Sequence, residues 1–400
     1  MWKTAKNFLG RKQNGSPQQL IHEGKLVTKS SEIATLMSQY FKEKVDKIRQ
    51  NLTNLDPDLT ACQEIMKNKN CRLSLCHVTQ NKIKHLLKNL KNSRSVSVDG
   101  LDNYSLKLAA EYVYKPLHHI ITLSIMQHRF PTGWKYAKVV PLFKNGSPTD
   151  RKNYRPVSLL SPLGKMFEKV IYSQIYTYFE KNRLFHENLH GYRKNRSTLT
   201  ALLQMHDKWV KAANQGQFSD AVLLDLSAAF DLVNHGILHE KLKVYGFDNE
   251  FTELISSYLS HRQSAVWISY CFSEYMEYDV GVPQGSNGGP LFFSIFFNDL
   301  PLSLDCDLEA YADDSTLFYS SKDPVVIEEM LNRNCDHVSV WMRRNRLKLN
   351  TDKIHFLTIG TSNKIGALTS QINVKIDGQK IVENDDKCEK TVGYKYAIKS

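Results

Sequence analysis

Two short apolar segments with aspartates at their ends constrain the fold of this chain more than any other part of its sequence. Residues 221–224 (AVLL) are consistent with a buried strand, and Asp225 follows directly. Residues 309–321 (EAYADDSTLFYSS) have strand propensity on both sides of a short polar centre, which predicts a hairpin with Asp313 and Asp314 at its tip. If this hairpin lies beside the first strand, one of its acids meets Asp225. Converging carboxylates repel each other unless a cation lies between them.

The acids also have an ordinary interpretation as turn and cap residues. Adjacent aspartates are common in turns, because aspartate tolerates the backbone angles of turns and is easily solvated. Asp225 would serve equally well as a cap for the next segment, a helical pattern that reaches Leu242 and has Gly246 as its expected C-cap. Because side chains alternate along a strand, Asp313 and Asp314 are not expected to be equivalent.

A metal site would give the same acids a chemistry. Carboxylates are hard oxygen ligands, and an incomplete set of them suits Mg²⁺, which shares its coordination shell with water and substrate phosphates. Two such ions would serve phosphoryl transfer, because one lowers the pKa of an attacking hydroxyl and the other stabilises the leaving pyrophosphate.

The composition favours a globular protein with a polyanionic partner. Of the 400 residues, 42% are hydrophobic and 24% are charged, which does not indicate disorder. The 53 Lys and Arg against 41 Asp and Glu give a formal charge of +12, which favours nucleic acid over a merely basic surface. Seven irregularly spaced cysteines imply no disulfide framework, and Cys71, Cys76 and His77 lack the second ligand pair of a zinc site. No apolar run approaches the roughly 20 residues that cross a bilayer, and the N-terminal segment is not a secretory signal, so we expect the nucleus or the cytoplasm.

The periodicity of the apolar residues predicts more helix than strand. An amphipathic helix begins at Ser31, its expected N-cap. Further helical patterns cover residues 79–92, 103–129, 163–182, 198–213 and 324–346, and short strands are predicted at 137–143, 221–225, 308–312 and 315–320. Scattered strands among many helices indicate an α+β fold with one central antiparallel sheet.

Glycine and proline mark two loops that carry polar groups, residues 142–158 and 281–293. In the second loop, GVPQGSNGGPLFF, the glycines allow a close backbone approach to a ligand. Gln284 offers an amide that both donates and accepts hydrogen bonds. The loop fits neither the Walker nor the dinucleotide-binding pattern.

In this order, the strand acid, the PQG loop and the YADD hairpin resemble the reverse transcriptase family. The likeness is greatest to the enzymes of non-long-terminal-repeat (LINE-type, Jockey-like) retrotransposons, and it runs from about residue 80 to about residue 396. The segments that carry it are WKYAKVVPLFKNG, NYRPVSLLSPLGKMFEKVI, HGYRKNRSTLTAL, LLDLSAAFDLVNH, FFNDLP, AYADDSTL and LKLNTDKIHFL. Seven segments in the right order are far more specific than YADD alone.

The resemblance implies a right-hand polymerase, in which fingers precede a palm that carries the acids. The palm is then a small antiparallel sheet backed by helices. The resemblance assigns the metal ions to Asp225, Asp313 and Asp314, with the carbonyl of Leu226 as a further ligand. We expect Asp313 to be the principal ligand of the hairpin and Asp314 to support it. The implied cofactors are two Mg²⁺ ions, which Mn²⁺ can replace.

The resemblance also implies contacts with substrates. The residues implied to bind the nucleotide are Arg155, Lys138, Phe230, Gln284 and Gly285, and those implied to meet the template are Arg193 and Arg196. Phe230 stands where the family crowds the 2′-hydroxyl and so favours deoxynucleotides; helix core is the alternative interpretation, and both can hold. Lys353 (in LNTDKI) is implied to protonate the leaving pyrophosphate, with a solvated lysine as the alternative.

Some positions depart from the family pattern. Asn287 and Gly288 stand where the family has two apolar residues, and Ile354 stands where it has threonine. TVG (residues 391–393) replaces the YLG near the primer, and the sequence ends at residue 400. We therefore expect the thumb to be largely missing and the endonuclease that usually precedes this region to be absent.

These inferences predict a domain order and a function. The expected domains are an N-terminal linker or extension (1–75), fingers (76–215), palm (216–360) and a truncated primer-grip region with the end of the palm (361–400). The expected function is an RNA-directed DNA polymerase, which extends a DNA primer on an RNA template with dNTPs. The alternative is a catalytically weak or inactive nucleic-acid-binding remnant. Phe230 and the PQG loop argue against a polymerase that makes RNA.

Overall fold

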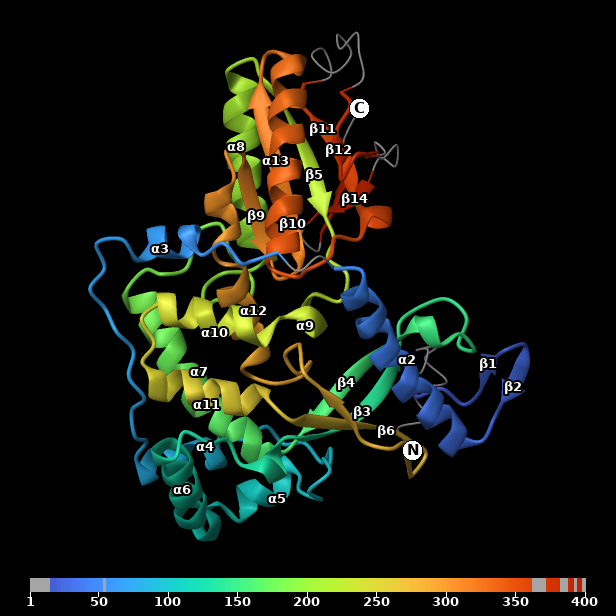
Figure 1. The fold of residues 1–400 in the computed structure, drawn as a ribbon, viewed down its shortest axis with the longest axis vertical. Coiled ribbons are helices and arrows are strands. Elements are labelled where there is room, and N and C mark those ends of the chain that lie inside the picture. Colours follow the sequence, from blue (N-terminus) through green and yellow to red (C-terminus); the bar gives the residue numbers. More distant parts are fainter. Residues whose placement is uncertain (1–14, 53–54, 362–371, 382–387, 392–393, 398–400) are drawn as a thin grey trace. The chain divides into compact units, whose positions relative to one another are not determined.

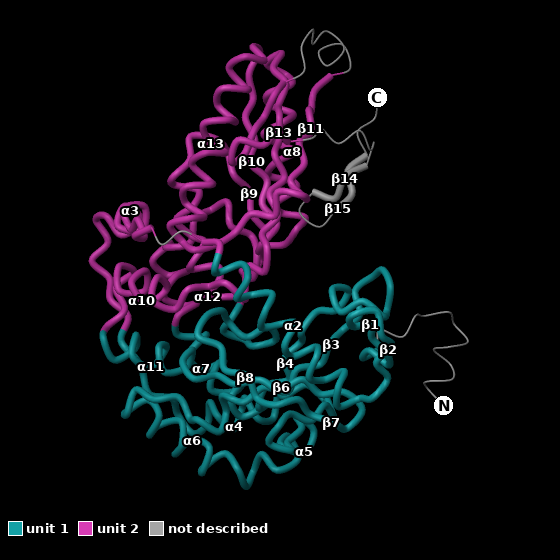
Figure 2. The backbone as a smooth tube through the Cα atoms, turned by 45° about the vertical axis from the view of Figure 1, so that its right-hand side comes forward, with its two compact units in different colours: residues 1–50, 74–174, 249–289 teal, residues 51–73, 175–248, 290–400 magenta. Residues whose placement is uncertain are grey.

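The computed structural model describes residues 15–52, 55–361, 372–381, 388–391 and 394–397. The chain divides into two compact units, each assembled from separate stretches (Figure 2). Unit 1 contains residues 1–50, 74–174 and 249–289, and unit 2 contains residues 51–73, 175–248 and 290–400. The four consecutive domains expected from the sequence remain a prediction about roles.

The core of unit 1 is a five-stranded sheet with one helix packed on it (Figure 1). The strands are β3 (Tyr136–Phe143), β4 (Tyr154–Leu160), β6 (Arg262–Ile268), β7 (Cys271–Phe272) and β8 (Met276–Tyr278). Their order is β4-β3-β6-β7, with β8 paired to β6, and the β3–β6 pair is parallel. The expected amphipathic helix is α2 (Ser30–Gln50), which packs Ile33, Met37 and Phe41 against Val139 and Val266 of the sheet.

The remaining elements of unit 1 are mostly helical. They are β1 (Leu20–His22), β2 (Lys25–Val27), α4 (Gln80–Lys88), α5 (Asn103–Leu108), α6 (Ala110–Met126), the first part of α7 (Pro162–Lys181) and α11 (Asn249–Leu259). The helical pattern at 103–129 therefore forms two helices, because Ala109 ends α5 and begins α6.

Unit 2 contains a four-stranded antiparallel sheet of order β11-β5-β10-β9. Its strands are β5 (Phe218–Leu224), β9 (Asp307–Tyr311), β10 (Asp314–Ser321) and β11 (His355–Ile359). On one face, Trp209 of α8 (Thr198–Asn214) packs against Phe318 in a core that includes Ala221 and Leu357. Val222 and Leu317 are fully buried neighbours that alternate to the other face, and α13 (Pro324–Arg344) also packs against β10.

Short elements complete unit 2. They are α3 (Thr60–Met66), α9 (Ala229–Leu232), α10 (His235–Val244), α12 (Gly289–Phe297), η3 (Leu300–Ser303), η4 (Thr351–Lys353), β12 (Lys375–Ile376), β13 (Gln379–Lys380), β14 (Cys388–Thr391) and β15 (Tyr394–Ala397). Gly246 ends α10 as predicted, because its φ of +84° permits the bonds from Gly246 N to Lys243 O and from Phe247 N to Leu242 O.

The structure corrects two expectations. The sequence predicts one central antiparallel sheet, whereas the structure has a sheet in each unit and one parallel strand pair. The sequence also predicts a continuous helical pattern after Asp225, whereas the structure has two helices there, α9 and α10. Asn234 causes the division, since its side chain accepts from Ile237 N and caps α10.

Other expectations concern cysteines, membranes and the end of the chain. The six cysteines that the structure describes with their side chains are free thiols. No helix in the described ranges is long and apolar enough to span a bilayer. The TVG segment extends beyond the described residues at 392–393.

Candidate active site

The acids predicted from the sequence lie at the same end of neighbouring strands of the unit 2 sheet. Asp225 directly follows β5, and Asp314 begins β10, where it pairs with Tyr311. Ala312 and Asp313 form the turn between Tyr311 and Asp314, and Ala312 has a φ of +60°. Since Ser315 lies opposite Leu224, the next step of the register sets Asp314 opposite Asp225. The expected hairpin is confirmed, and its register brings Asp314 as well as Asp313 to the end of β5.

Two side chains from the segment before β11 hold the Asp225 carboxylate. Asn350 donates from Nδ2 to Oδ2 at 2.7 Å, and the ammonium of Lys353 lies 3.3 Å from the same oxygen. The Asn350 backbone N also donates to the Asp225 carbonyl at 2.9 Å. The predicted Lys353 is therefore beside an acid of the site, and Asn350, which the sequence analysis missed, is closer still. Its only sequence signal is its place three residues before Lys353.

The carbonyl of Leu226 has a direction that fits its predicted role. Leu226 pairs with Leu349 in an antiparallel bridge, whose bonds run from Ser227 N to Lys348 O and from Asn350 N to Asp225 O. In this pattern the N–H and C=O groups of the paired residue itself point away from its partner. Because β10 is the other neighbour of β5, the Leu226 carbonyl points to the side from which the hairpin comes.

Residues 188–191, which overlap the HGYRKNRSTLTAL segment of the resemblance, lie against this hairpin, a contact that the sequence analysis did not predict. The Ala310 backbone N donates to Asn188 O at 2.9 Å, and His190 N donates to Ala310 O at 2.8 Å. Gly191 follows, and a Cβ atom there would lie 2.4 Å from the backbone N of Ala312. Only glycine allows this approach without displacing the turn that carries Asp313.

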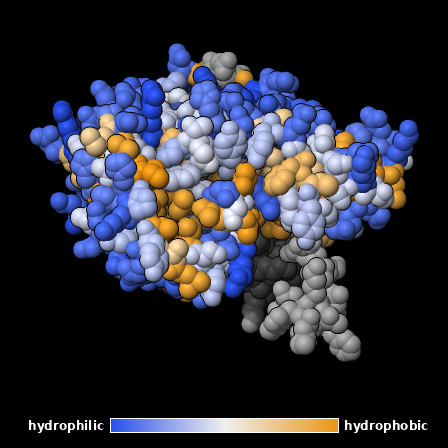
Figure 3. All heavy atoms as spheres, turned by 90° about the horizontal axis from the view of Figure 1, so that it is seen from below, coloured by the Kyte–Doolittle hydropathy of each residue, from blue (hydrophilic) through white to orange (hydrophobic). Residues whose placement is uncertain are grey.

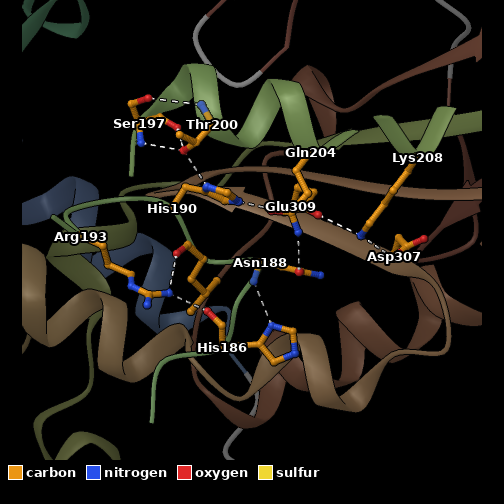
Figure 4. A network of polar contacts seen from close by, with 11 residues as sticks. His186, Asn188, His190, Arg193, Ser197, Thr200, Gln204, Lys208, Asp307 and Glu309 are labelled. Atoms are coloured by element: carbon orange, nitrogen blue, oxygen red, sulfur yellow. Dashed lines mark hydrogen bonds and ion pairs between the residues drawn. The ribbon is translucent and has the colours of Figure 1, made fainter. Parts of the chain in front are cut away.

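A buried polar network fixes this segment to β9 and α8 (Figure 4). His190 and Glu309 have fully buried side chains, with His190 Nε2 3.1 Å from Glu309 Oε2. The other ring nitrogen of His190 is 3.0 Å from Thr200 Oγ1. Lys208 donates to Glu309 at 3.0 Å and to Asp307 at 2.8 Å. Each carboxylate oxygen of Glu309 therefore has a partner, as burial of a charged group requires.

Aromatic rings stand next to the acids. Phe230, on α9, is half-buried and stacks on Phe293 at 4.8 Å, while the Tyr192 ring meets it edge-on at 6.0 Å. Burial, followed by the charge of Asp313, raises the pKa of Tyr192 to about 12. The Tyr192 hydroxyl is thus a neutral group close to the hairpin acids. Phe230 packs on the buried Phe293 without being fully buried itself, and its role toward a sugar remains a prediction.

The predicted nucleotide contacts all lie in unit 1 except Phe230. Lys138 and Arg155 share one face of the sheet, because Lys138 is opposite Leu159 and Arg155 is opposite Leu142. The Lys138 ammonium lies 3.6 Å from the centre of the Trp267 ring, and burial lowers the pKa of Lys138. Arg155 is exposed.

The PQG loop contacts strand β4. The Gln284 carbonyl accepts from Ser158 N at 3.1 Å, and a Cβ at Gly285 would lie 2.7 Å from Ser158 O. The close approach expected of Gly285 is therefore made to the protein's own strand. Asn287, one of the atypical positions, donates from its backbone N to the buried Glu168 at 2.7 Å and from Nδ2 to Lys165 O.

The two predicted template contacts differ. Arg193 has a side chain that is only 10% exposed, and it donates to Glu180 and to the carbonyls of His186 and Leu189. These hydrogen bonds indicate that Arg193 stabilises the conformation of the 186–193 segment. The half-buried Arg196 lies at the start of α8, and for both residues the template contact stays a prediction.

The donor set agrees in chemistry with a divalent cation. Asp225, Asp313, Asp314 and the Leu226 carbonyl offer only hard oxygen ligands, which Mg²⁺ prefers. Among the side chains that the structure describes, no three His, Cys, Asp or Glu residues are arranged so that they could hold a metal ion together. Magnesium at this site is therefore a proposal that rests on the donor chemistry and the register.

The fold and the site define a mixed α/β protein with aspartates at the end of the central strand of an antiparallel sheet. The family described as reverse transcriptase (RNA-dependent DNA polymerase) matches residues 143–394. This match covers more than half of the chain, which therefore belongs to the reverse transcriptase family.

Curated relatives confirm the resemblance to retrotransposon enzymes. The "Probable RNA-directed DNA polymerase from transposon BS" of Drosophila melanogaster is 30% identical over 67% of this chain and 30% of its own length. The "RNA-directed DNA polymerase from mobile element jockey" of the same species is 27% identical over 74% of this chain and 33% of its own length. The "Probable RNA-directed DNA polymerase from transposon X-element" is 27% identical over 66% and 29%, respectively. The chain spans about a third of the length of these relatives.

Proposed function

We propose that the chain is the polymerase part of a retrotransposon reverse transcriptase. It would extend a DNA primer on an RNA template with dNTPs, in the nucleus or the cytoplasm. The observation that carries this proposal is the register of β5 and β10, which brings Asp225 to the same end of the sheet as Asp313 and Asp314. The family membership supports it.

In the proposed reaction, the primer 3′-oxygen attacks the α-phosphorus of a dNTP, and the bond to pyrophosphate breaks. Asp225, Asp313 and Asp314, with the Leu226 carbonyl, would hold two Mg²⁺ ions. When bound, the ions would lower the pKa of the hydroxyl and neutralise the pyrophosphate. Asn350 orients the Asp225 carboxylate through its 2.7 Å bond.

The remaining residues act on the nucleotide and the leaving group. Lys353 has a side chain that is 56% exposed, with its ammonium beside Asp225, so it can release Asp225 and give its proton to pyrophosphate. Phe230, supported by the Phe293 ring, would crowd a 2′-hydroxyl. Arg155 and Lys138 would bind the triphosphate, and Gln284 and Gly285 would contact the nucleotide. Arg196 would meet the template, and Arg193 would act by holding its segment.

A catalytically weak, nucleic-acid-binding remnant is the second candidate. The observation that favours it is that, among the described residues, no group of three or more acids, histidines or cysteines is arranged to hold a metal ion. The formal charge of +12 would still attract RNA.

Primer extension on an RNA template separates these candidates. Asp313→Ala and Asp225→Ala should each abolish incorporation, whereas Asp336→Ala, which removes an exposed acid from α13, should leave it intact. RNA binding without incorporation in Mg²⁺ or Mn²⁺ would support the remnant. Incorporation that survives Asp313→Ala would overturn the assignment of the site.

A further inference from the structure

Unit 1 contains a cavity of about 720 Å³ that holds none of the residues assigned to nucleotidyl transfer. It lies between α6, α11 and the segment 127–135 that connects α6 to β3. Its apolar wall includes Ile120, Leu123 and Phe130, and its polar lining includes four hydroxyl groups, those of Ser124, Thr132, Ser257 and Ser260. Charged or titratable side chains also line it, those of Arg129, Lys135, Glu253, His128 and His261. Figure 3 views the molecule from below and shows apolar atoms exposed among hydrophilic ones on that face. The volume is in the range of sites for small organic ligands.

The charged residues that line this cavity include one buried lysine. Lys135 lines the cavity and is only 6% exposed. Burial, followed by the charge of Arg262, lowers the pKa of Lys135. The register explains their proximity, because Tyr136 pairs with Gln263 in the parallel β3–β6 ladder, so that Lys135 and Arg262 are neighbours one step earlier. The start of this ladder therefore brings two cations side by side in the interior.

The protein compensates these two cations incompletely. Arg262 is 7% exposed and donates to the Tyr258 carbonyl at 3.0 Å, but its Nη2 is buried with no hydrogen-bond partner among the described residues. Within that part of the chain, no carboxylate lies within 4.0 Å of Lys135 or Arg262, whereas Glu253 in the cavity wall lies 3.5 Å from His128. The buried Glu168 acts electrostatically on Arg262, so the cation that lacks a nearby negative charge is Lys135, and a buried charge without a close counter-charge is costly.

We propose that this cavity binds a phosphate group, which supplies the missing negative charge. The Lys135 ammonium and the serine and threonine hydroxyls are the donors that a phosphate accepts from, and Arg129 adds an exposed guanidinium at the same cavity. The apolar wall then takes the organic part of a phosphate ester such as a nucleotide. This site is separate from the acids of the proposed polymerase reaction and does not depend on them.

Thermal melting and calorimetric titration with inorganic phosphate, at constant ionic strength, test the proposal. Wild-type protein should gain stability with phosphate, because a ligand that binds only the folded state stabilises it. Lys135→Met should weaken phosphate binding by roughly tenfold or more, since it removes a charge-assisted hydrogen bond. Without phosphate the same variant should melt at or above the wild-type temperature, because a buried like-charge pair is gone.

Controls separate this effect from a general loss of positive charge. Lys115→Gln removes an exposed lysine from α6 of the same unit and should bind phosphate like the wild type. Arg129→Gln, at an exposed position, is a second variant that should weaken binding severalfold even if Lys135→Met fails to fold. Equal phosphate affinity of the wild type and the Arg129→Gln and Lys135→Met variants would overturn the proposal.

Two further titrations identify the source of the phosphate. A deoxynucleoside monophosphate that binds more tightly than inorganic phosphate, in a Lys135-dependent manner, identifies a free nucleotide. Single-stranded RNA whose affinity falls with Lys135→Met identifies a phosphodiester. Because these measurements need no primer extension, a failed polymerase assay leaves their outcome unaffected.

Discussion

At the scale of single residues, Asp225 depends on partners more than a hundred positions away in the chain. Asn350 and Lys353 both reach its Oδ2 atom, and the Asn350 bond is the shorter at 2.7 Å. An amide that holds one carboxylate oxygen limits how the other can turn, so Asn350 would set the orientation in which Asp225 meets the proposed cation.

Replacement of Asn350 should therefore slow the chemistry of the site. We expect Asn350→Ala to lower the rate of nucleotide incorporation by about tenfold, the value of one hydrogen bond to a charged group. Asn350→Asp should be worse, because it places a second carboxylate against Asp225. Single-turnover primer extension measures both, and an Asn350→Asp rate above that of Asn350→Ala would contradict this role.

The burial of Glu168 predicts how the free energy of unfolding depends on pH. It is fully buried in unit 1, where it accepts from the Tyr258 hydroxyl and from Asn287 N. Burial, only partly opposed by Arg262, raises the pKa of Glu168 above its ordinary value of 4.5. Below pH 4.5 the carboxyl is protonated in both the folded and the unfolded chain. As pH rises from 4.5 to the raised pKa, the unfolded chain releases the proton first, so the free energy of unfolding falls.

Glu168→Gln should remove this fall. Urea denaturation from acidic to neutral pH measures the slope of unfolding free energy against pH, which should be flatter in the variant than in the wild type over that window. The slope is the decisive quantity, because loss of the bond to Asn287 also lowers the absolute stability of the variant. Parallel slopes would show that Glu168 ionises normally in the folded protein.

At the scale of elements, the sequence predicts local patterns well and distant pairings poorly. The predicted helices at 163–182, 198–213 and 324–346 are α7, α8 and α13, since each has a clear apolar periodicity. The break between α9 and α10 had a local signal, the N-cap Asn234. The parallel β3–β6 pair had none, because it joins Tyr136 to Gln263 across a long stretch of chain.

The candidate site divides in the same way. Its acids could be predicted because each stands beside a strand with a recognisable pattern. Asn350 and the His190–Glu309 pair could not, because their contacts join separate elements and the single residues look ordinary. His190 and Glu309 matter as a unit, since together they fix the 188–191 segment along β9, next to the turn that carries Asp313.

Because Glu309 helps to fix the 188–191 segment along β9, its replacement tests how much this contact stabilises the protein. We expect Glu309→Leu to lower the free energy of unfolding by about 3–5 kcal/mol, because it leaves buried polar partners uncompensated. Asp307→Asn, at the exposed end of the same network, should cost at most about 1 kcal/mol. Chemical denaturation compares them, and equal losses would show that the buried pair has no special weight.

At the scale of the whole molecule, the chain runs back and forth between two units. Each unit draws on three separate stretches, so the segments of one core are far apart in sequence. This interleaving explains why consecutive domain boundaries do not coincide with the compact units. It also means that the surplus of 53 basic over 41 acidic residues is a property of the assembled molecule.

The net charge predicts how RNA binding responds to salt. A basic protein releases counterions when it neutralises phosphates, so the logarithm of affinity should fall linearly with the logarithm of salt concentration. If Arg196 contacts a template phosphate, Arg196→Gln should reduce this slope by about 0.7, the value for one single-strand contact, with thermal stability unchanged.

Arg193→Gln should instead lower the melting temperature, because it breaks bonds to Glu180 and to the His186 and Leu189 carbonyls. Fluorescence anisotropy across a salt series, paired with thermal melting, distinguishes the two arginines, and a reduced slope with unchanged stability for Arg193→Gln would reverse their assigned parts.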